Sequence, residues 1–315
     1  MSKRLFHTHL RQPALTALVV LLCWLAAACD IPMAYRPAPS RTLRDITTWR
    51  HYPQQIAVSR FKNETFIKNQ SLERLMEGAF ISTLSECRNI WLTSADSAES
   101  PQWLSLPPRD NADRVDSFAL CQSAARLGFR AVATGALTGL RVKETRTGWW
   151  RWRKTRNLLQ VQVNINVFDT VTAAKLLSRQ ETYELELDPA DAEVLASQTA
   201  SMVPGLAELL ENVSTKAAES TCDILDHTRW MTVLTKTPAG DIQLPVGSDQ
   251  RLKVGHRFEV FDASWVISGS DGEKYIVPGY SLGIIEITAV TARQAEARVI
   301  SGDAIESGNI AVALP

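Results

Sequence analysis

The chain has 315 residues, which is long enough for a large hydrophobic core and for more than one domain. Lys and Arg total 34 and Asp and Glu also total 34, so no net field recruits nucleic acid or an anionic membrane. A hydrophobic share of 45% and a charged share of 22% are ordinary for a globular protein. They exclude a disordered chain and, beyond the N-terminus, a protein with many membrane spans.

The N-terminus has the organisation of a secretory signal. Residues 1–12 carry bases and no acid, and residues 13–28 are almost entirely apolar or small. This run is shorter than the roughly 20 residues that span a bilayer, so we predict a cleaved signal peptide over 1–28. The sequence Leu-Ala-Ala-Ala-Cys that ends at Cys29 resembles the lipobox of bacterial lipoproteins. That resemblance implies that Cys29 becomes the mature N-terminus and carries acyl chains such as palmitate.

The alternative at this junction is ordinary cleavage after Ala28, which would leave Cys29 unmodified. We favour the lipoprotein, because a cysteine at that junction is otherwise a poor choice. Several acyl chains on Cys29 would anchor the protein stably to a bilayer. The expected location is the periplasmic side of the cell envelope. Asp30 follows the cysteine. In enterobacterial lipoproteins, Asp there disfavours transfer to the outer membrane, whereas other lineages do not follow that rule, so the choice of membrane stays open.

Residues 29–52 contain several prolines and no apolar period, which predicts a tether. Residues 53–228 then alternate between strand and helix patterns. Helical spacing over residues 193–220 predicts a helix, which Pro204 and Gly205 break into two pieces. The expected strands are 55–61, 89–93, 131–140, 159–167 and 175–187, with the last two as an antiparallel hairpin, and the expected helices are 71–84, 115–127 and 193–220.

The composition changes near residue 230, where helical periodicity ends. Nine of the fifteen glycines lie between Gly240 and Gly308. Short apolar runs between glycine-rich turns predict a small β-barrel over 229–315. The fold class is therefore α+β, a mixed-sheet α/β sandwich domain followed by a small all-β barrel domain. The expected barrel strands are 258–261, 265–267, 275–277, 284–290, 295–300 and 310–314.

Two short motifs mark the α/β domain. The first strand ends in Phe61, Asn63 and Thr65, and a later strand ends in Asp169 and Thr172. With the order of the elements, this resembles a periplasmic α/β domain shared by the curli secretion lipoprotein, penicillin-binding-protein activator lipoproteins, the N-terminal domain of TolB and the middle domain of flagellar assembly protein T. The resemblance implies an envelope protein that acts by binding other proteins.

The C-terminal part resembles the last domain of flagellar assembly protein T, and the two resemblances together cover about 80% of the chain. The pattern consists of a glycine before a first strand, a Leu-Gly strand, an alternating strand and a final turn. It is matched by Gly255, Phe258, Val260, Leu282, Gly283, Ile285, Ala297, Val299, Ile305 and Gly308.

The sequence offers little for catalysis. His51, His227 and His256 have no metal-ligand spacing, and we interpret them as surface or structural residues. No nucleophile elbow, P-loop or dinucleotide fingerprint occurs. Residues 134–139 superficially resemble a phosphate loop, but they lie inside a predicted strand, where close backbone packing explains the glycines better. We expect no catalytic residue, no metal and no cofactor.

The cysteines beyond the signal suggest one disulfide. Cys87 ends the first predicted helix and Cys121 lies in the second. In an oxidising compartment these two could pair, which would leave Cys222 unpaired. The alternative is that all of them are buried thiols, because connectivity is not readable from sequence.

The most unusual segment is 141–156, in which Trp and basic residues crowd between two predicted strands. Such a composition suits contact with a membrane interface or with a protein partner. The alternative is a folded-back hairpin whose Trp residues cap the core and whose charges are solvated. The acidic stretch 181–193 could neutralise this segment within one molecule or between neighbours. The contact residues that we predict are Trp149, Trp150, Arg151, Trp152, Arg153, Lys154 and Arg156.

These features predict a lipid-anchored periplasmic assembly or scaffold protein without enzymatic activity. Its partners would be envelope proteins, with a flagellar basal-body ring as the machine that the resemblance implies, and it could form a homo-oligomer. Nucleic acid is excluded by compartment. One alternative is a curli-type secretion channel, for which residues 141–157 are too short and too basic. Another is an activator of peptidoglycan synthesis, which leaves the C-terminal domain unexplained.

Overall fold

The structure is a computed structural model that describes residues 52–65, 70–149, 154–196, 203, 205–270 and 272–314. The predicted signal peptide, Cys29 and all of the predicted tether except Tyr52 lie outside the described residues.

The first sheet is mixed, with the strand order β3-β1-β4-β5-β6 and with β2 beside β4. The pairs of β1 with β3 and β4 are parallel, as is that of β2 with β4, whereas β4–β5 and β5–β6 are antiparallel. Alternation of apolar and polar residues produces the two long antiparallel partners, because each buries one face only. The strands are β1 (Gln54–Val58), β2 (Lys62–Asn63), β3 (Ile90–Ser94), β4 (Ala131–Thr147), β5 (Lys154–Asp169) and β6 (Lys175–Leu187).

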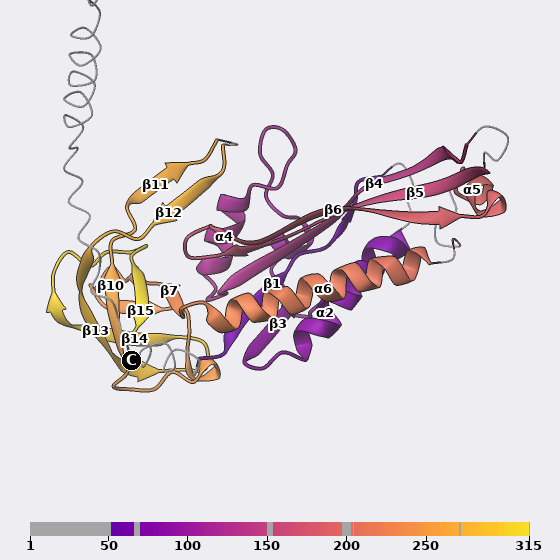
Figure 1. The fold of residues 1–315 in the computed structure, drawn as a ribbon. Helices are drawn as coiled ribbons and strands as arrows, with labels where there is room; N and C mark the ends of the chain where they lie inside the picture. The colour runs from indigo at the N-terminus through magenta and orange to yellow at the C-terminus, as the bar shows by residue number, and fades with distance from the viewer. Residues whose placement is uncertain are drawn as a thin grey trace, which may run out of the picture. The chain divides into compact units, whose positions relative to one another are not determined.

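Helices cover both faces of this sheet. On one face α2 (Gln70–Ser85) packs against α6 (Leu206–His227), as Figure 1 shows. On the other face lie α3 (Gln102–Ser105) and α4 (Ser117–Ala125), with Leu104, Leu120 and Phe129 buried against the sheet. A fifth helix, α5 (Pro189–Ala196), follows β6. The predicted break between the last two helices is therefore present, with Gly205 in a left-handed conformation at the start of α6.

The Phe61, Asn63 and Thr65 motif organises the backbone after β1. The Asn63 Oδ1 accepts hydrogen bonds from the Thr65 N–H (3.1 Å) and hydroxyl (2.7 Å). The buried Glu77 carboxylate accepts the Phe61 N–H at 2.9 Å. A side chain on Gly135 would meet the Phe61 ring, since an added Cβ would lie 2.4 Å from it. Close packing thus explains this glycine, as predicted for the segment that resembles a phosphate loop.

The second sheet has the strand order β7-β15-β10-β13-β14-β9-β8, with antiparallel pairs throughout. Only Leu234 separates β7 from β8, so the two ends of the strand order meet and the sheet is barrel-like. A separate hairpin joins β11 (Trp265–Ser268) to β12 (Lys274–Val277). The barrel strands are β7 (Met231–Val233), β8 (Thr235–Lys236), β9 (Ile242–Leu244), β10 (Arg257–Phe261), β13 (Ser281–Val290), β14 (Ala295–Gly302) and β15 (Ile310–Ala313), and η5 (Ser248–Gln250) is a short 3-10 helix.

Each sheet has a core of its own. In the second sheet, Trp230, Phe258 and Ile285 are buried together, and Tyr52 packs on Trp230 with ring centroids 5.1 Å apart. The last residue of the predicted tether is thus part of this core. The two sheets with their helices confirm the α+β class.

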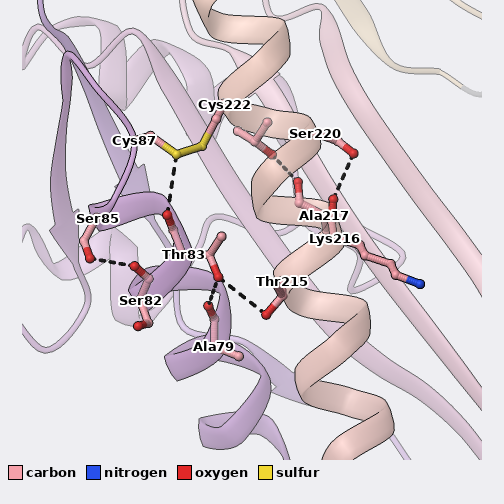
Figure 2. The surroundings of a disulfide bond; sticks show 11 residues. Ala79, Ser82, Thr83, Ser85, Cys87, Thr215, Lys216, Ala217, Ser220 and Cys222 are labelled. Atoms are coloured by element: carbon pink, nitrogen blue, oxygen red, sulfur yellow. Dashed lines mark hydrogen bonds between the residues drawn. A yellow bond between two sulfur atoms is a disulfide. The ribbon is translucent and has the colours of Figure 1, made fainter.

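The predicted disulfide between Cys87 and Cys121 is wrong. Cys87 pairs with Cys222, and Cys121 is a buried free thiol. Figure 2 shows the bond joining the end of α2 to α6. The reason is the fold, because α2 and α6 share one face of the sheet while α4 lies on the other.

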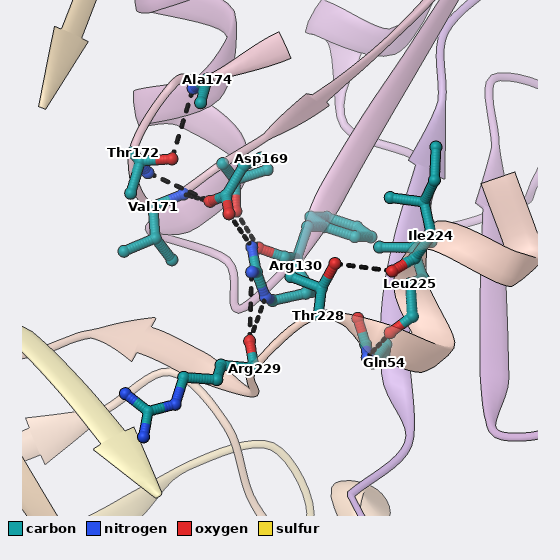
Figure 3. Close-up of polar contacts among 12 residues, drawn as sticks. Gln54, Arg130, Asp169, Val171, Thr172, Ala174, Ile224, Leu225, Thr228 and Arg229 are labelled. Atoms are coloured by element: carbon teal, nitrogen blue, oxygen red, sulfur yellow. Dashed lines mark hydrogen bonds and ion pairs between the residues drawn. The ribbon is translucent and has the colours of Figure 1, made fainter. Parts of the chain in front are cut away.

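A buried ion pair lies where the first sheet meets the chain that leads to the second. Arg130 Nη1 and Asp169 Oδ2 are 2.6 Å apart, with side chains 2% and 4% exposed (Figure 3). Arg130 also donates to the carbonyl of Arg229, from Nη2 at 3.2 Å and from Nε at 3.4 Å. The Asp169 Oδ1 accepts the N–H groups of Val171 (2.8 Å) and Thr172 (3.1 Å). One aspartate therefore shapes the β5–β6 turn and neutralises the arginine that holds the connection between α6 and β7.

We predict that Asp169→Asn lowers the free energy of unfolding by about 3–5 kcal/mol, measured by urea denaturation. Asparagine keeps the oxygen that accepts from the turn but leaves the buried guanidinium without its counter-charge. The matched control is Asp96→Asn, which breaks the exposed pair of Arg60 and Asp96 and is expected to cost less than about 1 kcal/mol. Equal losses for the two variants would contradict a structural role for the buried pair.

We predict that Cys87→Ser with Cys222→Ser lowers the free energy of unfolding by about 2–5 kcal/mol, because the bond closes a long loop. The two cysteines are 135 positions apart in sequence. Peptide mapping without reductant should yield a Cys87–Cys222 linked peptide, with Cys121 alkylated only after denaturation. A reductant should destabilise the native chain but not the double variant. A linked Cys87–Cys121 peptide would refute the assignment.

Candidate interaction surface

The β4–β5 hairpin carries the predicted contact segment. Its ladder runs from Ala131 opposite Asp169 to Thr147 opposite Lys154, with a bulge between Leu137 and Gly139. The predicted strand over 131–140 thus continues for seven more residues, to Thr147. The Trp-rich and basic segment is partly the end of a strand rather than a loop.

The distal part of β4 has no buried face. Leu140 is buried, but from Arg141 to Trp149 every residue is exposed except the half-buried Thr145. Trp149, directly after Gly148, is 89% exposed. Because the ring contacts so little of the chain, Trp149 does not cap the core, and the folded-back alternative fails for this residue. A large exposed aromatic residue at a hairpin tip is typical of a contact surface.

The basic side chains around Trp149 differ in how far they are neutralised. Arg156 pairs with Glu186 of β6 at 3.5 Å, and Arg146 lies 3.9 Å from Glu144. Within the described residues, Arg141 and Lys143 form no ion pair, and both are exposed. The acidic β6 therefore compensates part of the hairpin charge within one molecule and leaves the β4 side positive.

The remaining predicted contact residues are only partly placed. Lys154 begins β5 opposite Thr147, next to the tip in the ladder. Trp150, Arg151, Trp152 and Arg153 lie outside the described residues.

The structure also exposes apolar residues that sequence analysis did not single out. In the β11–β12 hairpin, Trp265, Val266 and Ile267 are exposed, and so is Tyr280 after it. Their apolar runs correctly predict strands, but a strand pattern alone does not say that a two-stranded hairpin lacks a layer to cover it. The only available signal was the shortness of these two runs.

A groove of about 870 Å³ lies between the end of the α/β domain and the barrel. Trp91, Leu127 and Arg126 line it. An exposed ion pair also lies in the lining, with Arg293 Nη2 and Glu99 Oε2 2.8 Å apart. Its lining combines the aromatic rings of Trp91 and Phe129 with charged and amide groups. Nothing in it forms a nucleophile with an adjacent base.

Burial shifts the pKa values of two of the sequence-identified residues, His256 and Cys121. His256 Nδ1 lies 3.0 Å from the Tyr52 hydroxyl, and burial, with the nearby Lys253 charge, lowers the pKa of His256. Burial, followed by the nearby carboxylates of Asp169 and Asp116, raises the pKa of the Cys121 thiol well above its usual range. His227 is exposed, with Nδ1 2.7 Å from the Asp223 carbonyl, and His51 lies outside the described residues.

The part of the chain that the structure describes contains no group of three or more His, Cys, Asp or Glu side chains placed to hold a metal ion. None of its helices has both the length and the apolar character that crossing a bilayer requires.

Comparison with known proteins gives no family assignment. No family model matches the chain, and no curated protein sequence matches it. Solved structures that resemble it include lipoprotein GNA1162 from Neisseria meningitidis, at 16% identity over 47% of this chain and 96% of that chain, with a TM-score of 0.28. The PelC dodecamer from Paraburkholderia phytofirmans matches at 15% identity over 53% and 87%, with a TM-score of 0.28. TolB from Acinetobacter baumannii matches at 14% identity over 80% and 51%, with a TM-score of 0.27. These structural neighbours thus include a bacterial lipoprotein and TolB, and the fold class itself rests on the two sheets described above.

Proposed function

We propose that this chain is a lipid-anchored scaffold on the periplasmic side of the cell envelope, without enzymatic activity. Lipid on Cys29 ties it to the membrane, and the tip of the β4–β5 hairpin binds an envelope protein. The sequence resemblance to flagellar assembly protein T makes a flagellar basal-body ring the first machine to test. Nucleic acid is not a partner.

The observation that carries this proposal is the exposure of Trp149 just after strand β4, whose distal part also carries bases that are unpaired among the described residues. Trp and Arg are among the residues that most often dominate binding energy at protein interfaces. Arg141 and Lys143 on the adjoining strand have no acidic partner in the described chain. They would steer an acidic surface toward the tip and set its orientation.

We predict that a photo-crosslinking amino acid at position 149 of the full-length chain captures a defined envelope protein in living cells. The same probe at Leu106, an exposed apolar residue on another part of the α/β domain, is the control and should not capture it. Trp149→Ala should weaken binding of the captured protein by about 30-fold or more, the equivalent of a hot-spot loss of about 2 kcal/mol.

Two outcomes would contradict the proposed function. Adducts to lipid alone at position 149 would make the tip a membrane contact. A protein captured equally from positions 149 and 106 would show collision rather than a binding surface.

A further inference from the structure

The distal part of the first sheet has two open edges. Strands β1 and β2 pair with β4 only up to Leu137, so β4 from Leu140 to Thr147 has no neighbour on its outer side among the described residues. At the other side of the sheet, β6 ends the strand order. Long open edges are templates for pairing with another strand, and proteins usually blunt them with charge.

The two edges carry opposite charges on the same face of the sheet. Residues directly opposite in antiparallel strands project to the same side, so the ladder defines rows across β4, β5 and β6. One row is Arg141, Gln160 and Glu184, and the next is Lys143, Leu158 and Glu186. Each row begins with a base at the β4 edge and ends with an acid at the β6 edge.

The first of these rows is already linked within the molecule. Gln160 Nε2 donates to Glu184 Oε1 at 2.9 Å, which holds the acid at the edge. Arg141, at the other end of the row, has no such partner in the described chain. In this row the acid is therefore hydrogen-bonded to its neighbour, while the base at the β4 edge is available to a partner.

The opposite face of the same strands is apolar at both edges. Its rows are Leu140, Val161 and Tyr183, and then Val142, Leu159 and Leu185. Val142 is 41% exposed, and Tyr183 and Leu185 are half-buried. If an edge like that of β6 lay beside β4 with these rows continued, Leu185 would cover Val142, and Glu184 and Glu186 would lie opposite Arg141 and Lys143.

We propose that this edge pairs with a second copy of the chain, β6 of one copy lying parallel to distal β4 of the next. The two strands run in the same direction, because both are antiparallel to β5. In that register Glu184 meets Arg141 of the next copy, and Glu186 meets Lys143.

The charges also disfavour symmetric pairing of like edges. Pairing of β4 with β4 through Arg141 and Lys143 places bases against bases, and pairing of β6 with β6 through Glu184 and Glu186 places acids against acids, which is unfavourable for residues directly opposite. The association is therefore head-to-tail, which yields a closed ring or an open filament rather than a two-fold dimer. This edge includes Arg141 and Lys143, which also flank the partner surface, but it does not include Trp149, and it adds self-association to the proposed scaffold role.

The test reverses the charge of one edge at a time in the full-length chain, extracted in mild detergent and measured by light scattering after size exclusion. Arg141→Glu with Lys143→Glu makes both edges acidic, and Glu184→Lys with Glu186→Lys makes both edges basic. The native chain should form oligomers larger than a dimer. Each variant alone should lose them, and an equimolar mixture of the two variants should regain them.

Two controls protect this test from misfolding. Glu208→Lys with Glu211→Lys reverses two exposed charges on α6 and should assemble like the native chain. The chain with all four edge substitutions has reversed polarity and should assemble with itself, even though Lys at position 186 faces Arg156. Circular dichroism checks that each variant is folded.

A native chain that stays monomeric would overturn the inference and leave the scaffold role at the Trp149 tip untouched. Folded edge variants that assemble like the native chain, or whose mixture does not assemble, would equally overturn it. Loss of the crosslink at position 149 with assembly intact would instead remove the proposed partner surface and keep the self-association.

Discussion

The buried contact of Arg130 with Asp169 is the constraint on which the arrangement of the two sheets depends. A charge taken out of water must be paired, and here the Asp169 carboxylate supplies the counter-charge to the buried guanidinium. The same arginine holds the Arg229 carbonyl in the connection to the barrel. The turn that Asp169 shapes also accepts the Ile276 N–H at the Thr172 carbonyl, at 2.8 Å. The junction is thus fixed by directional bonds rather than by apolar area alone.

The motifs that suggested a family are devices of the backbone. Asp169 orders one turn and Asn63 orders another. The Phe61 ring packs directly against Gly135, where any side chain would clash with it. None of these residues presents a reactive group to solvent. Such motifs therefore predict the fold and say nothing of the chemistry.

Much of the fold was predictable where one face of an element is buried. The alternation in β5 and β6 and the helical spacing in α2 predicted all three. The extension of β4 beyond Leu140 was not predictable, because a strand whose residues are exposed on both faces shows no alternation of apolar and polar residues.

The very short strands and the disulfide were not predictable, because both depend on contacts between residues far apart in sequence. Strands β7, β8 and β9 have three, two and three residues, too few for a period, and are held by their neighbours in the barrel. The pairing of Cys87 with Cys222 depends on α2 lying against α6, a contact far apart in sequence. Sequence analysis could not decide whether Trp149 is buried or exposed, since the composition of the segment fits a core cap and a contact surface equally. What sequence did carry was the sign of each edge of the distal sheet, and the strand register turns those signs into a direction of assembly.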